Sequence, residues 1–239
     1  MSTAAPAPPF EARSLVKRFG RFTALDRVSL SVGTGEILAL FGRNGAGKTT
    51  VLHLAATLMK PSEGELFYEG RPASSAPREL RRSVGMVSHA SFLYPDLTVR
   101  ENLEFFSRLY GLRDRGARIK EAIARADLTV RADSPVRSLS RGMHQRLTIA
   151  RALLHAPLVL LLDEPYTGLD PASAERFTRQ LSELRETGTA AILTTHDLER
   201  GLEVADRVAL LESGRLVYEG PGGQDLEEFR KLFAKLTGK

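Results

Sequence analysis

Short apolar runs alternate with amphipathic stretches along this chain. Residues 37–41 and 158–162 are continuous apolar runs of strand length, typical of strands buried on both faces of a parallel sheet. Residues 190–195 form a third such segment, and apolar spacing predicts helices over 49–59 and 171–186. This alternation favours an α/β core with a mostly parallel sheet.

The character of the pattern divides the chain into three parts. Residues 1–9 are rich in Ala and Pro and are predicted to be a disordered tail. Strands return on both sides of a helical interval, so residues 10–89 and 156–239 are assigned to the core. Residues 90–155 are predicted to be a helical subdomain inserted between these two segments.

Three helices are predicted inside that interval. The first begins at Thr98, and Glu101 three residues later completes a capping box. The second covers residues 119–126, and the third runs from Ser140 to about residue 155.

A glycine-rich segment lies between the first apolar strand and the helix that follows it. Gly42, Gly47, Lys48 and Thr49 occupy the fixed positions of the pattern G-x-x-x-x-G-K-[ST]. A loop without Cβ atoms can coil its backbone N–H groups around a phosphate chain, and the N-terminus of a helix favours anions. The sequence therefore predicts a site for a nucleoside triphosphate such as ATP. Its expected phosphate-binding residues are Gly42, Arg43, Asn44, Gly45, Ala46, Gly47, Lys48, Thr49 and Thr50.

Two carboxylates follow the buried run at 158–162. Asp163 ends that strand, where parallel sheets present ligands, and can hold Mg²⁺ through water together with the hydroxyl of Thr49. Glu164 can orient or deprotonate an attacking water. His196 ends the next predicted strand and can hydrogen-bond the terminal phosphate or the water, although a histidine at that place can also be structural. These residues predict triphosphate hydrolysis.

Two further features bear on the kind of nucleotide site. Ser140 is a predicted N-cap and Gly142 leaves backbone N–H groups accessible, so the third helix offers a second anion-binding start. Nothing obliges it to reach the phosphates of its own chain, so a partner chain could supply them. Phe19 precedes a turn at Gly20, where its ring could stack on a base or make a small core contact.

Taken together, these motifs resemble the ATP-binding subunits of ABC transporters over roughly residues 10 to 220. The resemblance rests on their order and spacing. Its elements are the phosphate loop 42–50, the signature Leu139-Ser-Arg-Gly-Met143, the strand and carboxylates 158–164, the loop Thr167-Gly-Leu-Asp170, and His196.

The resemblance implies a P-loop NTPase core with an N-terminal antiparallel β subdomain and an inserted helical subdomain. It also implies a head-to-tail dimer, of the same or a related chain, that holds two ATP molecules at its interface. Lys48 and Thr49 of one subunit would then face Ser140 and Gly142 of the other. Asp170 would communicate across the interface, and Phe19 would stack on adenine in place of the more usual Tyr.

Two positions depart from the usual pattern of the family. The signature has Arg141 and Met143 where many members have Gly and Gln, yet Ser140 and Gly142 remain. His89 occupies the place of a Gln that, in the family, binds Mg²⁺ and the attacking water. Because imidazolium repels a cation, we expect coupling through His89 to depend on pH in the mildly acidic range.

A narrower resemblance comes from residues 85–89 and 91–94 together with the signature. They are similar to the haem-exporter ATPases of cytochrome c maturation, while drug, lipid and polysaccharide exporters of similar build stay open.

Charge and composition indicate which partners to expect. No apolar run approaches the roughly 20 residues that span a bilayer, so we expect a separate integral membrane permease to supply the span. The N-terminal residues show no charged-then-apolar pattern, so we expect no secretory signal there. The chain has no cysteine, and its net charge of +5 is spread along its length. We therefore expect a peripheral protein on the cytoplasmic face of the inner membrane, cytoplasmic when unassembled, without nucleic acid. The alternative is a soluble ABC-type ATPase acting on nucleic acid or ribosomes, which usually carries two cassettes or a long coiled-coil insertion.

Overall fold

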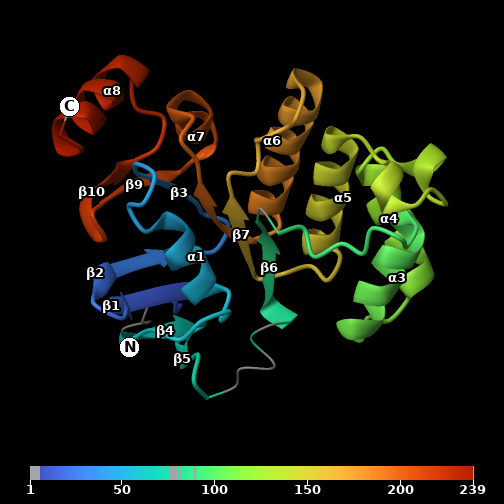
Figure 1. Ribbon diagram of the computed structural model, residues 1–239, viewed down its shortest axis with the longest axis horizontal. Coiled ribbons are helices and arrows are strands. Elements are labelled where there is room, and N and C mark those ends of the chain that lie inside the picture. Colours follow the sequence, from blue (N-terminus) through green and yellow to red (C-terminus); the bar gives the residue numbers. More distant parts are fainter. Residues whose placement is uncertain (1–5, 76–79, 81, 89, 239) are drawn as a thin grey trace.

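The computed structural model describes residues 6–75, 80, 82–88 and 90–238 of the chain. Part of the predicted disordered tail, residues 1–5, therefore lies outside the described residues, and so does His89. Two sheets and a set of helices make up the rest (Figure 1). The predicted α/β fold class is confirmed.

The larger sheet has six strands in the order β10-β9-β3-β8-β7-β6. All neighbouring pairs are parallel except β10 with β9, which form an antiparallel hairpin. The strands β3, β7 and β8 are buried at every position, as expected for uninterrupted apolar runs. Their bounds are β3 Ile37–Phe41, β6 Val84–Val87, β7 Val159–Asp163, β8 Ala190–Thr194, β9 Arg207–Glu212 and β10 Arg215–Pro221.

A smaller antiparallel sheet has the order β2-β1-β4-β5. Its strands are β1 Phe10–Phe19, β2 Phe22–Val32, β4 Glu63–Tyr68 and β5 Arg71–Pro72. The sequence pattern predicts strands over residues 11–15 and 26–32 in this region. The first two strands are longer than that, because register shifts along β1 let the pairing continue to Phe19 and Phe22. As a result Phe19 lies at the end of a strand, next to a two-residue turn.

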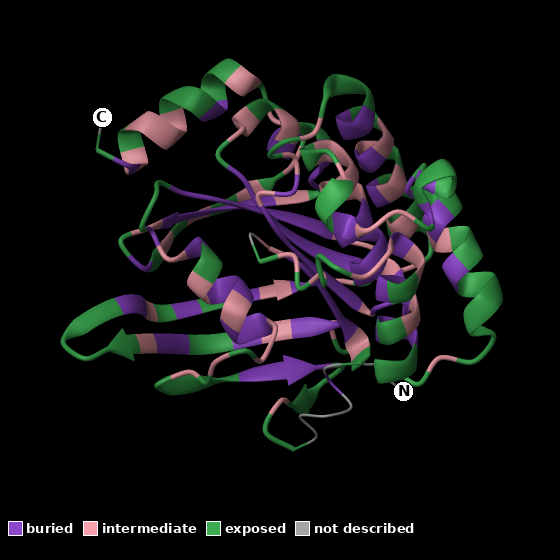
Figure 2. Ribbon diagram, turned by 45° about the vertical axis from the view of Figure 1, so that its right-hand side comes forward, coloured by how far each residue is buried: buried purple, intermediate pink, exposed green. Residues whose placement is uncertain are grey.

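Helix α1 packs in one hydrophobic core with both sheets, through buried side chains such as Val51 and Leu54. Figure 2 shows the buried residues concentrated on the strands of the larger sheet, with exposed residues on the outer faces of the helices. The sequence placed the end of this helix too late. It ends at Ala55 rather than residue 59, since Thr57 adopts a left-handed backbone conformation (φ 56°) that ends the helix.

Three helices gather on one side of the larger sheet and share a core of their own (Figure 1). The capping box of Thr98 and Glu101 is present at the start of the first of them, as predicted. The second begins at Arg115 rather than residue 119. The helices are α1 Lys48–Ala55, α3 Val99–Leu109, α4 Arg115–Arg125, α5 Arg141–Leu153, α6 Pro171–Glu186, α7 Leu198–Val204 and α8 Leu226–Leu236, with short 3₁₀ turns at Thr129–Arg131 and Val136–Ser138.

Candidate nucleotide-binding site

The phosphate loop connects β3 to α1, so the central strand of the larger sheet leads directly into it. Gly47 caps α1 with φ 107°, in the left-handed region that favours glycine. A Cβ atom at this position would lie 2.7 Å from the carbonyl oxygen of Ala24. The tight approach of β2 therefore requires glycine where the loop becomes helix.

Lys48 is almost completely buried, with 8% of its surface exposed. Its Nζ donates to the carbonyl oxygens of Gly42 (2.6 Å) and Arg43 (3.1 Å). Burial lowers the pKa of Lys48, and the charges of Glu164 and Asp163 oppose that shift. An ammonium group placed inside the loop and bound to carbonyl dipoles is well positioned to pair with a phosphate anion.

Asp163 ends β7 and is also buried, with 4% exposed. The Thr49 hydroxyl donates to its Oδ2 (3.0 Å), and the Thr194 hydroxyl at the end of β8 donates to its Oδ1 (2.6 Å). These bonds fix the carboxylate beside the start of α1. A hydroxyl and a carboxylate oxygen side by side fit Mg²⁺, which takes oxygen ligands and keeps several waters.

Glu164 and His196 lie together although 32 residues separate them in sequence. Glu164 has φ 51°, an unusual conformation for a residue with a side chain, and its N–H donates to the Thr194 carbonyl oxygen (3.0 Å). Its Oε2 lies 2.8 Å from Nδ1 of His196. The His196 side chain is 72% exposed, so this contact holds one ring nitrogen while most of the side chain stays accessible. The pair can hold and orient a water or a phosphate oxygen.

A cleft of about 360 Å³ connects Lys48, Asp163 and Glu164 to the antiparallel sheet, and His196 is not part of its lining. Phe19 lines it with 49% of its surface exposed and Lys17 Nζ 5.1 Å from its ring centroid. Phe19 is therefore a cleft residue rather than a small core contact. Phe22 lines the same cleft with 63% exposed, and the sequence did not single it out. The complete lining is Phe19, Phe22, Ala24, Arg43, Asn44, Gly45, Gly47, Lys48, Thr49, Thr50, Asp163 and Glu164.

The signature residues do not line this cleft. Ser140 caps α5 by accepting a hydrogen bond from the N–H of Met143 (3.3 Å), as predicted from the sequence. A Cβ atom on Gly142 would lie 3.8 Å from Oδ2 of Asp170, so the start of α5 lies beside the loop that precedes α6. Asp170 caps α6, and its hydrogen bonds from Ser173 lower its pKa.

Two of the predicted loop residues, Gly42 and Ala46, are buried and do not line the cleft. Ala46 is 4% exposed, and its N–H donates to the carbonyl oxygen of Arg43 (3.1 Å). The guanidinium of Arg43 reaches across to donate to the carbonyl oxygen of Thr237, after α8 (3.2 Å). This hydrogen bond joins residues 194 positions apart, and no sequence pattern predicted it. His89 lies outside the described residues, so its predicted role stays a prediction.

A strand, a phosphate loop and a helix, with an aspartate at the end of a parallel strand beside them, define a P-loop nucleoside triphosphatase. The family model described as ABC transporter matches residues 25–167. The chain belongs to the ABC transporter family, as an ATP-binding subunit with the ATPase fold and activity of that family.

The relatives that carry this assignment cover most of the chain. The protein is 41% identical over 217 residues to the Nod factor export ATP-binding protein I of Burkholderia lata, covering 90% of this chain and 71% of that one. It is 38% identical over 248 residues to the protein of the same name in Ralstonia nicotianae, covering 96% and 77%. None of these comparisons confirms the haem-exporter type.

Solved structures give the same assignment. An ATP-binding subunit of an ABC transporter matches with a TM-score of 0.84 and 29% identity, over 96% of this chain and 95% of the other. A dimeric ATP-binding cassette in a post-hydrolysis state, bound to ADP and Pi, matches with a TM-score of 0.82 and 28% identity, over 90% and 99%. Within the described part of the chain, no helix is long and apolar enough to cross a membrane.

Proposed function

We propose that this chain is the energy-coupling ATPase of an exporter. Two cassettes, of the same or a related chain, would bind two ATP molecules head to tail and drive a separate integral membrane permease. The chain would lie peripherally on the cytoplasmic face of the inner membrane, and would be cytoplasmic before assembly. The observation that carries this proposal is a nucleotide cleft lined by the residues expected to bind ATP from one cassette, without the signature residues expected from the other.

That half-site is visible in the lining of the cleft. Lys48 and Asp163 face it, whereas Ser140 and Gly142 lie at the start of α5, outside its lining. The start of α5 at Ser140 and Gly142 could bind an anion, since among the described residues the Ser140 side chain accepts from one backbone N–H of the first turn, that of Met143. A second cassette placed head to tail would bring these groups to the exposed side of the phosphates. The dimeric solved cassette supports this arrangement.

The chemical roles follow from the positions of the side chains. Lys48 and the loop N–H groups would hold the phosphates, while Phe19 would contact adenine. Glu164 would take a proton from the attacking water, and His196 would hold the water or the terminal phosphate in place. Thr49 and Asp163 would hold Mg²⁺, which when bound neutralises charge on the phosphate oxygens.

An exposed apolar patch supports the membrane partner. The patch consists of Tyr94 and Phe105, 46% and 40% exposed, with the exposed Phe92 and Leu109 nearby in sequence on the segment before α3 and on α3. Tyr94 and Phe105 are in edge-to-face contact, with ring centroids 4.9 Å apart. Neighbouring exposed aromatic residues are typical of a protein–protein interface. We propose that the permease docks on this patch.

Export is supported by the relatives, whose name describes them as ATP-binding proteins of Nod factor export. The fold of this chain does not determine its cargo, because proteins of the same fold carry different functional sites. The haem-exporter type remains a prediction from residues 85–89 and 91–94 together with the signature 139–143.

The sandwich is tested with Glu164→Gln. The amide keeps a hydrogen-bond acceptor for His196 but cannot take the proton, so hydrolysis should fall by about 10²–10⁴-fold while ATP binding persists. Light scattering after gel filtration with ATP and Mg²⁺ should then detect a stable dimer. Adding Ser140→Arg to this variant should return it to a monomer that still binds ATP. Glu175→Gln, an exposed carboxylate on α6, serves as the matched control and should leave turnover unchanged.

Two results would count against the proposal. A Glu164→Gln variant that binds ATP yet stays monomeric would contradict the two-cassette site. Co-purification with ribosomes or nucleic acid, and with no integral membrane protein, would favour the soluble ATPase over the transporter subunit.

Loss of membrane-protein capture in Phe105→Ser with ATPase activity retained would support docking at the patch.

A further inference from the structure

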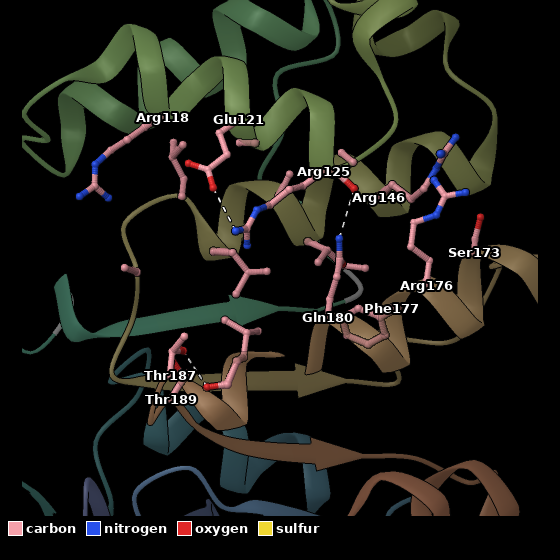
Figure 3. A pocket seen from close by; sticks show the side chains of 18 of the residues that line it. Arg118, Glu121, Arg125, Arg146, Ser173, Arg176, Phe177, Gln180, Thr187 and Thr189 are labelled. Carbon is pink, nitrogen blue, oxygen red and sulfur yellow. Dashed lines mark hydrogen bonds and ion pairs between the residues drawn. The ribbon is translucent and has the colours of Figure 1, made fainter. Parts of the chain in front are cut away.

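A second cavity lies between α4 and α5 on one side and α6 on the other (Figure 3). It has a volume of about 310 Å³ and shares no lining residue with the nucleotide cleft. Its size is at the lower end of the roughly 300–1,000 Å³ that small-molecule sites span. The mechanism of hydrolysis does not use it.

The interior of the cavity is apolar. Phe177 of α6 and Ile149 of α5 line it, and both are almost completely buried, with 2% and 4% of their surface exposed. The aliphatic part of the lining is completed by Leu153, Leu154, Leu169 and Leu184. Such walls favour an alkyl chain over a polar molecule.

One end of the cavity carries a net positive charge. Arg146 and Arg176 come together there from α5 and α6 (Figure 3), and both pair with the single carboxylate of Asp127, at 2.8 and 2.9 Å. Two guanidinium groups against one carboxylate leave one positive charge unmatched. The Nε of Arg146 is buried and has no acceptor among the described residues. A buried donor of this kind costs free energy until an acceptor reaches it.

The lining carries three other charged groups, of which Glu121 and Arg125 pair with each other, whereas the exposed Arg118 of α4 has no ion-pair partner among the described residues. Glu121 and Arg125 of α4 form an ion pair at 3.0 Å, drawn as a dashed line in Figure 3. Gln180 donates to the carbonyl oxygen of Arg125 (3.2 Å) and so joins α6 to α4 above the cavity. Arg118 lies at the end opposite Arg146 and its guanidinium points away from the cavity (Figure 3), so the two guanidinium groups that lie together in the lining are those of Arg146 and Arg176.

We propose that this cavity binds a free medium-chain carboxylate. The carboxylate would pair with Arg146 and Arg176, and the chain would lie against Phe177, Leu153 and Leu184. An apolar chamber with one positive end is complementary to a single-chain anion. Its volume admits one short chain, which excludes a membrane lipid with two acyl chains.

The position of the cavity gives the ligand a means to control the ATPase. Arg146 lies on α5, the helix that starts at Ser140. The hydroxyl of Ser173, in the cavity wall, donates to Oδ2 of Asp170 (3.1 Å). A bound chain would touch both helices and hold them at one spacing, so the placement of the signature and of Asp170 would become sensitive to it. This regulation goes beyond the proposed function, and direct binding can be measured without it.

Calorimetric titration of the full chain without nucleotide tests the site. Sodium decanoate, below its micelle concentration, should bind with a stoichiometry of one, whereas decanol and decyltrimethylammonium should bind at least about tenfold more weakly. Arg176→Leu should weaken decanoate by about tenfold and leave decanol unchanged. Leu184→Trp should fill the chamber and abolish binding of both. Arg179→Leu, which removes an exposed arginine of α6 outside the cavity, is the matched control and should bind like the parent.

Circular dichroism establishes that each variant is folded, and Leu184→Trp tests the site even where Arg176→Leu does not fold. Binding of decyltrimethylammonium as tight as that of decanoate would overturn the proposal. So would decanoate binding that survives Leu184→Trp, or no binding to the parent. In the regulatory arm, decanoate should change the ATPase rate of the parent and of Arg179→Leu but not of Leu184→Trp. An unchanged rate in the parent under saturating decanoate overturns the regulation alone.

Discussion

His155 ties the helical region to the larger sheet and should make the stability of the fold depend on pH. It follows α5, is 9% exposed, and its Nε2 lies 3.2 Å from the carbonyl oxygen of Val84 in β6. Its ring stacks on Tyr110, with ring centroids 3.9 Å apart, while Nδ1 is buried and unpaired within the described structure. Burial lowers the pKa of His155 from the ordinary 6.5 to about 4, and the charge of Arg151 acts in the same direction.

The sign and size of the effect follow from this shift. The folded protein keeps the ring neutral, whereas the unfolded chain protonates it below pH 6.5. The stability due to the neutral ring is therefore complete above pH 6.5 and lost as the pH falls towards 4. The difference between the two pKa values corresponds to about 3 kcal/mol when fully titrated, and about 2 kcal/mol of it is lost between pH 7.5 and 5.0.

Replacing His155 with Gln removes this titration and keeps a donor for the Val84 carbonyl. Urea unfolding of both proteins, followed by circular dichroism without nucleotide, gives the free energy of unfolding at pH 7.5 and 5.0. Gln should cost about 1 kcal/mol at pH 7.5 by loss of the ring stack. The parent should then lose about 2 kcal/mol more than the variant on going to pH 5.0. Because other titrating groups are common to both proteins, equal losses would refute the reasoning.

Three further outcomes are expected. Gly47→Ala should abolish ATP binding in an equilibrium titration, because its Cβ would meet the Ala24 carbonyl at 2.7 Å and the loop would have to move. Phe229→Ala should destabilise the fold by about 3–5 kcal/mol in urea unfolding, because the ring is 1% exposed and packs on Phe41 at 5.1 Å. His89→Gln should flatten the acid limb of the ATPase pH profile if the sequence-based role of His89 holds, and an unchanged limb would contradict it.

The parts of the fold that could be predicted are those with local signals. The apolar runs at 37–41 and 158–162 became buried strands, since a strand covered on both faces admits few polar side chains. The capping box at Thr98 was found because all its atoms come from four consecutive residues. Asp163 could be placed beside Thr49 because the carboxyl ends of parallel strands lie at one edge of a sheet.

Other features depend on contacts that no local pattern encodes. The bond from Arg43 to Thr237 and the stack of His155 on Tyr110 each join elements that are far apart in the sequence. Phe22 was missed because the strands of the first hairpin extend further than their apolar spacing suggests, owing to the register shifts in β1. The cavity between α4, α5 and α6 is likewise set by tertiary packing and has no signature in any one of these helices.

The contacts around α5, the helix that begins within the signature, connect this helix to the segment that carries Glu164. Gln145 of α5 donates to the carbonyl oxygen of Pro165 (2.9 Å), the residue immediately after Glu164. Arg141 packs so closely on Gly168 that any side chain there would overlap its guanidinium. A shift of α5 must therefore break the Gln145 bond or move the segment that holds Glu164 beside His196. Since Glu164 already has a left-handed backbone, its orientation depends on these neighbours rather than on its own preference. The position of the helical region and the orientation of Glu164 are thus set by the same few contacts.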